Sequence, residues 1–255
     1  MADITLIVPV YNGEKFLTEL LESVIHQSCS NWNCICVNDG STDTSLSILR
    51  AYAEQDNRIT IIDQPNQSCG VARNNAIKQV TSEYVMFADQ DDLLHPQAFE
   101  IALNAIRQSQ TDVVRFEMRR FTDSPRFEQL NPNPIPSPSK RTSIFVWRHI
   151  FKTAAVKEIA FPPISGGEDI AWMHELEWQK LSFAEIDAGL YYNRQLPTSR
   201  SRGISQNYVN NVHFAYKWMR TRAKALNVMS PFLQLDILRQ QFMFDLSVIY
   251  RKYFI

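Results

Sequence analysis

The first 120 residues alternate short apolar runs with longer segments of helical periodicity. Apolar runs typical of buried strands cover residues 4–8, 33–37, 59–62, 84–88 and 112–117. Helical spacing or a helix-start residue predicts helices between them, over residues 14–27, 42–54, 70–80 and 96–108. Strands and helices in this alternation form a mainly parallel sheet with helices on both faces, so the predicted fold class is α/β.

The pattern changes after Arg120. Five prolines between residues 124 and 139 exclude regular structure throughout this segment, which predicts a surface loop that is mobile or partly extended. Helical stretches are predicted over residues 143–156, 168–180 and 206–255, the last with a break at Pro231. A chain of 255 residues is long enough for one core with such an appendage.

Composition excludes several classes of protein. The net charge of -1 gives no sign of a nucleic-acid binder. The 4 cysteines lack zinc-type or C-x-x-C spacing, which favours reduced thiols of a cytosolic protein over a disulfide framework. The first residues do not resemble a signal peptide, and no run approaches the roughly 20 apolar residues of a spanning helix. We expect a cytoplasmic protein, or one held peripherally at the inner face of the plasma membrane.

Three carboxylates, Asp89, Asp91 and Asp92, follow the apolar run 84–88. They are therefore expected at the carboxyl end of a strand, where open α/β sheets bind their ligands. Like charges this close repel each other unless a cation lies among them. Oxygen ligands suit Mg²⁺ or Mn²⁺ better than zinc, so we expect a divalent metal held against a phosphate-bearing substrate.

Other polar and aromatic residues are predicted at the same edge. Tyr11, in the turn after Pro9, offers a ring on which a planar base can stack. Asp39 can accept a hydrogen bond from an imide N–H, as on uracil, or can be a turn residue. Arg73 can bind a carboxylate or phosphate through both of its terminal nitrogens, or be a solvated helix charge. The chain has neither a P-loop nor the dinucleotide-binding fingerprint.

Together these motifs resemble the inverting, GT-A-fold glycosyltransferases of family 2. The matching segments are Val8-Pro9-Val10-Tyr11-Asn12, Val37-Asn38-Asp39-Gly40-Ser41-Thr42-Asp43, Ala72-Arg73-Asn74 and Asp89-Gln90-Asp91-Asp92. One departure is Ala76, which stands where the family pattern often has glycine.

The resemblance implies a GT-A (Rossmann-like) sheet and a role for each matching residue. Pro9, Tyr11 and Asp39 would hold the nucleobase, most often uracil, and Arg73 would support that pocket or the phosphates. Asp89 and Asp91 would form the D-x-D motif that meets the ribose and a metal-bound diphosphate. Asp92 would be a neighbour in the same network.

The second half resembles the family only through short segments. The family has a Glu-Asp pair where this chain has Glu168 and Asp169, which implies Asp169 as the general base and Glu168 as the second choice. Simple capping of a helix start is the alternative. Trp147 would line the donor-sugar or acceptor pocket, or else pack in the core. Arg194 would reach the diphosphate, and residues 199–202 would form a lid over the donor or a solvated basic loop.

The function implied is a metal-dependent inverting transfer of a hexosyl or N-acetylhexosaminyl group. The expected donor is a UDP-sugar, with Mn²⁺ or Mg²⁺ as cofactor. The acceptor would be a saccharide or lipid-linked saccharide in bacterial surface polysaccharide synthesis. Residues 1–118 would form the nucleotide-sugar-binding half, residues 119–204 the acceptor and catalytic-base half, and residues 205–255 a C-terminal helical extension.

Two other functions are considered. A sugar-phosphate nucleotidyltransferase would need a Gly-rich N-terminal loop, which this chain lacks. A non-catalytic nucleotide-sugar-binding scaffold would not need the acids at Asp89, Asp91 and Asp169.

The tail mixes aromatic and basic residues, such as Phe242, Tyr250 and Arg251. A helix of this kind can lie on an anionic membrane. It can equally pack on its own domain or on a second subunit, so peripheral membrane contact and homo-oligomerisation both stay open.

Overall fold

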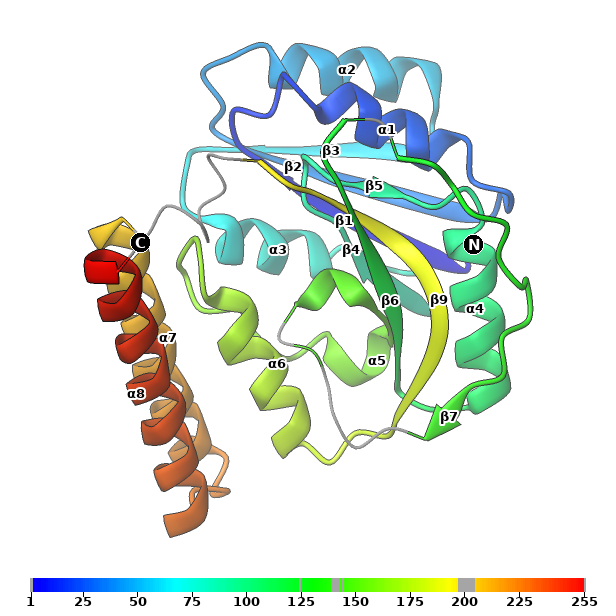
Figure 1. Cartoon of the computed structure of the whole chain (residues 1–255). Helices are drawn as coiled ribbons and strands as arrows, with labels where there is room; N and C mark the ends of the chain where they lie inside the picture. Colours follow the sequence, from blue (N-terminus) through cyan, green and yellow to red (C-terminus); the bar gives the residue numbers. More distant parts are fainter. Residues whose placement is uncertain (1, 124, 139–142, 144, 197–204, 255) are drawn as a thin grey trace.

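The computed structural model describes residues 2–123, 125–138, 143, 145–196 and 205–254 (Figure 1). A sheet crosses the whole domain. Its strands lie in the order β3 (Ile59–Gln64), β2 (Trp32–Asp39), β1 (Ile4–Val10), β4 (Tyr84–Phe87), β8 (His149–Lys152), β6 (Val113–Phe121), β9 (Phe183–Arg194) and β5 (Leu93–Leu94). A short strand, β7 (Ser137–Pro138), pairs with β9.

The sheet is mixed and mostly parallel. The strands β3, β2, β1 and β4 are parallel neighbours, and β6 is parallel to β9. The exceptions are β8, which runs antiparallel between β4 and β6, and the short strands β5 and β7. The predicted α/β class is therefore confirmed.

Helices cover both faces of the sheet, as predicted. In Figure 1, α1 (Leu17–Ile25) and α2 (Ser45–Gln55) lie over one face. The helices α3 (Cys69–Ile77), α5 (Thr153–Val156) and α6 (Glu168–Trp178) lie over the other. The remaining domain helix, α4 (Ala98–Ser109), packs against β6, β8 and β9. The four cysteines are free thiols, which agrees with the prediction.

An aromatic cluster in the core links the elements that carry the predicted acids. The ring of Phe87, at the end of β4, contacts Phe151 of β8 at a centroid distance of 5.9 Å and Trp172 of α6 at 5.7 Å. Phe161 stacks on Trp172 at 4.5 Å. The cluster therefore holds the end of β4 and the first turns of α6 against one another.

The prediction of a helix over residues 143–156 is wrong in its middle. This segment contains a 3-10 turn, η1 (Val146–Arg148), then β8, and only then the short helix α5. Ile150 and Phe151 are fully buried because β8 is inserted between β4 and β6. Pairing with two strands distant in the sequence overrides the local helical pattern.

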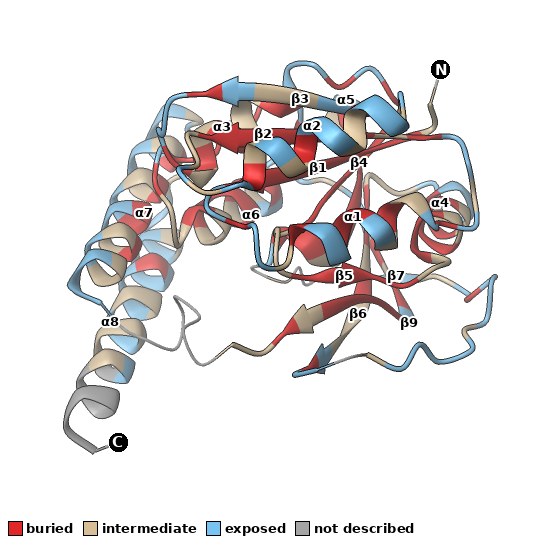
Figure 2. Cartoon of the chain, turned by 90° about the horizontal axis from the view of Figure 1, so that it is seen from above, coloured by how far each residue is buried: buried red, intermediate tan, exposed pale blue. Residues whose placement is uncertain are grey.

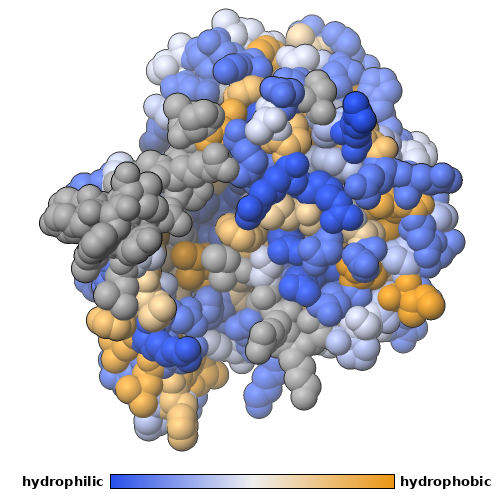
Figure 3. All heavy atoms as spheres, viewed as in Figure 1, coloured by the Kyte–Doolittle hydropathy of each residue, from blue (hydrophilic) through white to orange (hydrophobic). Residues whose placement is uncertain are grey.

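Several second-half predictions are confirmed. Residues 125–136 have no regular structure, as the prolines predict. The tail forms a helical hairpin of α7 (Gln206–Ala225) and α8 (Pro231–Phe254), with its break before Pro231. Figure 2 shows α7 against the domain and α8 on its outer side, and Figure 3 shows hydrophobic side chains gathered on this hairpin. Within the described residues, no helix has the length and apolar character needed to cross a membrane.

Candidate functional site

A buried arginine brings the predicted acids together. Arg73 lies on α3 and is 1% exposed, so it is not a solvated helix charge. Its Nη1 donates to Glu168 Oε1 and to Asp169 Oδ1, both at 2.7 Å, and its Nη2 donates to Asp89 Oδ1 at 2.9 Å. Burial alone would lower the pKa of Arg73, but the surrounding carboxylates raise it well above its usual value. One guanidinium therefore joins the end of β4 to the start of α6.

The environment of Asp169 suits a general base. Burial raises the pKa of its carboxyl to about 7, although the Arg73 guanidinium acts in the opposite direction. Its second oxygen accepts a hydrogen bond of 3.3 Å from the Val146 N–H. A carboxyl group that titrates near neutral pH is well matched to proton abstraction from a hydroxyl.

Glu168 is more fully engaged than Asp169. One of its oxygens pairs with Arg73, and the other accepts a hydrogen bond of 2.6 Å from the Gly166 N–H just before α6. Glu168 thus stabilises the loop that leads into α6. This contact resembles capping of the helix start, which was the alternative to a catalytic role. Asp169 is the better candidate for the base.

Asp92 is buried and forms a structural network with β9. Its carboxylate accepts hydrogen bonds from the Tyr191 hydroxyl at 2.7 Å, the Asn193 side-chain amide at 3.1 Å and the Arg194 N–H at 2.7 Å. The Tyr191 hydroxyl oxygen in turn accepts from the Asp89 N–H at 3.0 Å. Asp92 therefore orients the D-x-D loop, while Asp89 and Asp91 stay partly exposed on it.

The predicted nucleobase residues lie at the ends of β1 and β2. Pro9 is the second-to-last residue of β1, and Tyr11, just beyond the strand, is 39% exposed. The buried Asp39 accepts hydrogen bonds from the Gln64 side chain and from the Gln67 and Ser68 N–H groups. Among the described residues, Oδ2 of Asp39 accepts one hydrogen bond, from Ser68, and since each carboxylate oxygen has two lone pairs, one acceptor position remains on it.

Gln90 is a residue that the sequence analysis missed. Its side-chain oxygen accepts from the Tyr11 N–H at 2.8 Å, and its amide donates to the Tyr11 carbonyl at 3.0 Å. This double hydrogen bond ties the turn after β1 to the D-x-D loop after β4. The signal in the sequence is its position between Asp89 and Asp91, in a loop that the sequence already predicts at the site.

Trp147 is packed between two rings. It stacks on Tyr191 at 4.5 Å and on Phe145 at 4.9 Å, and it is almost fully buried. This geometry agrees with the core-packing alternative, and a lining role in a sugar pocket stays a prediction. Through Tyr191 the indole supports the hydroxyl that binds Asp92.

Arg194 is held by this chain's own residues. Its Nη2 pairs with Glu19 at 2.8 Å and its Nε donates to the Asp91 carbonyl at 2.8 Å, while its guanidinium lies over the rings of Phe16 and Phe121. Arg194 is buried and held in place by these contacts, and its contact with a diphosphate stays a prediction. The expected lid over residues 199–202 lies outside the described residues.

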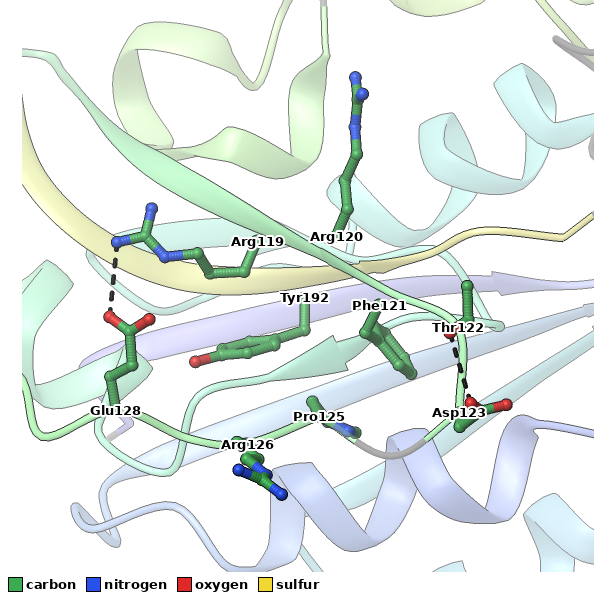
Figure 4. A pocket seen from close by; sticks show the side chains of 9 residues that line it. All are labelled: Arg119, Arg120, Phe121, Thr122, Asp123, Pro125, Arg126, Glu128 and Tyr192. Atoms are coloured by element: carbon green, nitrogen blue, oxygen red, sulfur yellow. Dashed lines mark hydrogen bonds and ion pairs between the residues drawn. The ribbon is translucent and has the colours of Figure 1, made fainter.

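A pocket of about 310 Å³ lies beside the C-terminal half of β6 (Figure 4). It is bounded by Tyr192 of β9 and by Pro125, Arg126 and Glu128 of the proline-rich segment. Tyr192 is in register with Arg119, and Asn193 is in register with Arg120. Because side chains alternate along a strand, Tyr192 faces this pocket while Asn193 faces Asp92 on the other side of the sheet.

Arg120 is a second residue that the sequence analysis did not single out. In Figure 4 its side chain points away from Tyr192 and Arg126. Its register partner Asn193 binds Asp92, so the Arg120 guanidinium lies on the face of the sheet that carries the acids. It is exposed there.

Asp89 and Asp91 fit a divalent metal ion that is bound partly by the protein and partly by the phosphates of a substrate. In the part of the chain that the structure describes, no group of three His, Cys, Asp or Glu side chains could hold a metal ion alone. Mg²⁺ is commonly bound through one or two carboxylates together with substrate phosphates. The partly exposed carboxylates of Asp89 and Asp91 match that requirement.

Comparisons with known proteins identify the relatives of this chain. The sequence profile of Glycosyl transferase family 2 matches residues 5–210. Glycosyltransferase GlyA of Streptococcus pneumoniae serotype 4 is 30% identical over 217 residues, which cover 84% of this chain and 30% of GlyA. A poly(ribitol-phosphate) beta-glucosyltransferase of Bacillus spizizenii is 32% identical over 177 residues, which cover 65% of this chain and 28% of that protein. The chain thus spans less than a third of the length of either relative.

Solved structures share the fold. TarS 1–349 of S. aureus in complex with UDP-GlcNAc has a TM-score of 0.75 at 23% identity, covering 95% of this chain and 72% of that chain. Mannosyltransferase PcManGT of Pyrobaculum calidifontis, in complex with GDP-Man and Mn²⁺, has a TM-score of 0.62 at 16% identity, covering 98% and 82%. At these identities the likeness concerns the fold, and it confirms the expected GT-A type.

Proposed function

This chain belongs to glycosyl transferase family 2, and we propose that it is a metal-dependent inverting enzyme that moves a sugar from a UDP-sugar to an acceptor hydroxyl. The observation that carries the proposal is the position of Arg73. It is bonded at once to Asp89 of the donor-side motif and to Asp169, the candidate base. The donor-side motif and the candidate base must lie close together for transfer, and both are bonded to the Arg73 side chain.

The donor would bind along the carboxyl ends of β1, β2 and β4. Tyr11 would stack on the uracil, and the free acceptor position on Asp39 would take its imide hydrogen. Asp89 and Asp91 would hold Mn²⁺ or Mg²⁺ against the diphosphate. When bound, such an ion stabilises the negative charge that develops on the leaving phosphate. The complex of PcManGT with Mn²⁺ supports this cofactor class.

Asp169 would act on the acceptor. Its carboxylate takes the proton from the acceptor hydroxyl, and that oxygen forms a bond to the anomeric carbon. The bond between this carbon and the β-phosphate oxygen breaks on the opposite face, and UDP leaves with the electron pair. The anomeric configuration inverts, so an α-linked donor gives a β-linked product. The name of the Bacillus spizizenii relative, a beta-glucosyltransferase, supports this stereochemistry.

The exposed Arg120 would add positive charge near the diphosphate. It lies on the face of the sheet on which its register partner, Asn193 of β9, binds Asp92. An arginine there can bind two phosphate oxygens at once. The sequence predicts this contact for Arg194, which is buried and pairs with Glu19, whereas Arg120 is exposed.

The sugar and acceptor classes follow from relatives. UDP-GlcNAc in TarS and the glucosyl group in the beta-glucosyltransferase support a hexosyl or N-acetylhexosaminyl donor. The name of the Bacillus spizizenii relative gives poly(ribitol-phosphate) as the acceptor of that protein, and for this chain we propose a saccharide or lipid-linked saccharide acceptor in the assembly of a bacterial surface polysaccharide. The whole protein's substrate is part of this proposal, because the chain covers less than a third of these relatives.

The test is release of UDP from a panel of UDP-sugars and acceptors, with and without Mn²⁺, followed by NMR of the product. We expect Mn²⁺-dependent release with one donor and a β-linkage in the product. An α-linked product from an α-linked donor would contradict the inverting mechanism. Tight UDP-sugar binding without transfer to any acceptor would support the scaffold alternative instead.

A further inference from the structure

The outer face of α8 is apolar and exposed. We use "outer face" for Phe232, Leu235, Leu238, Phe242 and Met243, whose side chains are between 45% and 85% exposed. Their spacing along the helix places them on one side of α8. In Figure 3, hydrophobic side chains gather on the α7–α8 hairpin.

The opposite side of α8 has its own partner. Ile237 is fully buried, and Leu233 and Phe244 pack in the same small core with residues of α7. The inner side therefore already accounts for the attachment of α8 to α7. The outer face is a second apolar surface on the same helix. A helix that packs only on its own domain needs a single apolar side.

The hairpin is strongly basic, whereas the rest of the chain is acidic. Residues 206–255 contain seven Lys and Arg against two Asp and Glu, a net charge of +5. Residues 1–205 contain 19 Lys and Arg against 25 Asp and Glu, a net charge of -6. Such a division within one chain points to a partner of negative charge at the hairpin.

Exposed cations lie on both helices of the hairpin. Lys217 and Lys224 are exposed on α7, and Arg239 is exposed on α8 between outer-face residues. Asp236 is an exposed acid on α8, and it accepts a hydrogen bond from Gln240. Long basic side chains beside apolar ones can bury their stems while their charged ends stay at the polar surface.

We propose that the α7–α8 hairpin docks on an anionic lipid surface, with the outer face of α8 in contact with the lipid. An apolar helix face flanked by Lys and Arg is the pattern of helices that lie in the membrane interface. Anionic headgroups attract such cations within about one Debye length, roughly 8 Å at physiological ionic strength. A second copy docked through the same face would bring two hairpins of charge +5 together, which their repulsion opposes.

The hairpin is connected directly to the loop that leads to the candidate base. The Asn211 side chain of α7 donates to the Ser165 carbonyl at 2.8 Å, and a Cβ at Gly166 would lie 3.0 Å from the Tyr208 ring. Docking on lipid would therefore hold the acceptor side of the site near the membrane surface. That consequence for a lipid-linked acceptor rests on the proposed function, whereas the docking itself does not.

The test is cosedimentation of the full chain with vesicles, without any donor or acceptor. One set contains neutral phosphatidylcholine alone, and the other contains phosphatidylcholine with about one third phosphatidylglycerol. We expect binding to the anionic vesicles that weakens as salt is raised, and little binding to the neutral ones. Equal binding to both sets, or to neither, would overturn the proposal.

Substitutions then locate the surface. The triple variant F232Q/L235Q/F242Q should lower partitioning into anionic vesicles at least ~10-fold. The control Ile135→Gln removes an equally exposed apolar side chain, 84% against 85% for Phe232, from the proline-rich segment and should leave binding unchanged. A second variant, K217E/K224E, keeps the apolar face and should weaken binding to anionic vesicles only.

Three further measurements separate the outcomes. Circular dichroism should show the same thermal midpoint for the triple variant as for the unsubstituted chain, since these side chains are exposed. UDP release with a water-soluble acceptor should be unchanged, so loss of lipid binding is distinct from loss of catalysis. If sedimentation shows a dimer that the triple variant dissociates while vesicle binding is unaffected, the outer face is a contact between copies and the proposal fails.

Discussion

At the scale of single residues, the site depends on the charge balance around Arg73. One guanidinium is shared by the carboxylates of Asp89, Glu168 and Asp169. One cation against three acids leaves the cluster with excess negative charge, which is the electrostatic condition for binding a further cation. The same excess, together with burial, keeps the pKa of Asp169 raised to about 7.

Asp169→Asn should abolish most transfer without loss of donor binding. The amide oxygen can still accept from Arg73, so the fold of the cluster is retained, but the side chain can no longer take a proton. We expect turnover to fall by ~10²–10⁴-fold while the affinity for UDP in Mn²⁺ is unchanged by calorimetry. Glu168→Gln is the matched control and should cost less. Near-normal turnover of Asp169→Asn would remove it from the role of base.

The pH profile should report the same carboxyl. Its raised pKa of about 7 means that a proton is retained up to neutral pH, and the protonated form cannot act as a base. The value of kcat/KM should therefore fall by about tenfold per unit as pH drops below 7, and level off above it. Initial rates with saturating Mn²⁺ measure this. A flat profile from about pH 5 to pH 8 would contradict it.

Arg120→Ala tests the proposed diphosphate contact. It should raise KM for the donor ~10-fold without changing the thermal midpoint, because the side chain is exposed. Arg119→Ala is the control from the same strand, since its neighbour Tyr192 lies on the opposite face. Similar effects of both substitutions on KM would argue against a specific contact from Arg120.

At the scale of elements, the site is built from loops that bind each other. Gln90 joins the turn after β1 to the loop after β4, and Asp92 joins that loop to β9. The start of α3 contacts the loop before α6, because the Gly70 N–H donates to the Ile164 carbonyl at 3.1 Å. Arg73 and Asp169 are thus positioned by backbone contacts as well as by their own ion pair.

Gly70→Ala should disturb this positioning. An added Cβ would lie 2.0 Å from the Pro162 carbonyl oxygen, which belongs to the backbone and cannot rotate away. We expect a loss of about 1–3 kcal/mol in the free energy of unfolding and a drop in kcat. In the control Gly189→Ala, the three atoms nearest the new Cβ all belong to the Arg119 side chain, the first at 3.1 Å, and that side chain can move. Urea unfolding and turnover measure both, and equal tolerance of the two changes would contradict the prediction.

At the scale of the whole molecule, the hairpin is joined to the domain by a buried ion pair. Glu175 of α6 is 1% exposed, and Arg222 of α7 donates to its two oxygens at 2.9 and 2.5 Å. A small apolar core of residues from α6, α7 and α8 adds to the attachment of the hairpin. The acidic domain and the basic hairpin therefore meet at an interface that contains a specific ion pair.

Arg222→Met should destabilise the protein by leaving Glu175 buried without its cation. Breaking a buried pair from one side costs roughly 3–5 kcal/mol, and we expect about half of that because Arg222 is partly exposed. Arg220→Met is the control, since Arg220 bonds to Gln241 within the hairpin. Denaturant unfolding compares them, and equal stability of the two variants would show that the pair does not hold the hairpin.

The sequence alone determined the β/α alternation of the first half and the helical hairpin with its break at Pro231. These elements depend on local spacing and on residues such as proline, whose effect is intrinsic to the chain. It also indicated that Asp89 and Asp91 follow a strand, because the apolar run before them is unambiguous.

Only the tertiary structure decided the rest. The strand β8 forms inside a segment of helical pattern because β4 and β6 pair with it, and no local signal contains that pairing. From the sequence, the partner of Arg73 could be a carboxylate, a phosphate or water. The packing of α3, β4 and α6 decides that its partners are Asp89, Glu168 and Asp169. Contacts between residues almost 100 positions apart are set by the fold, which a single sequence does not display.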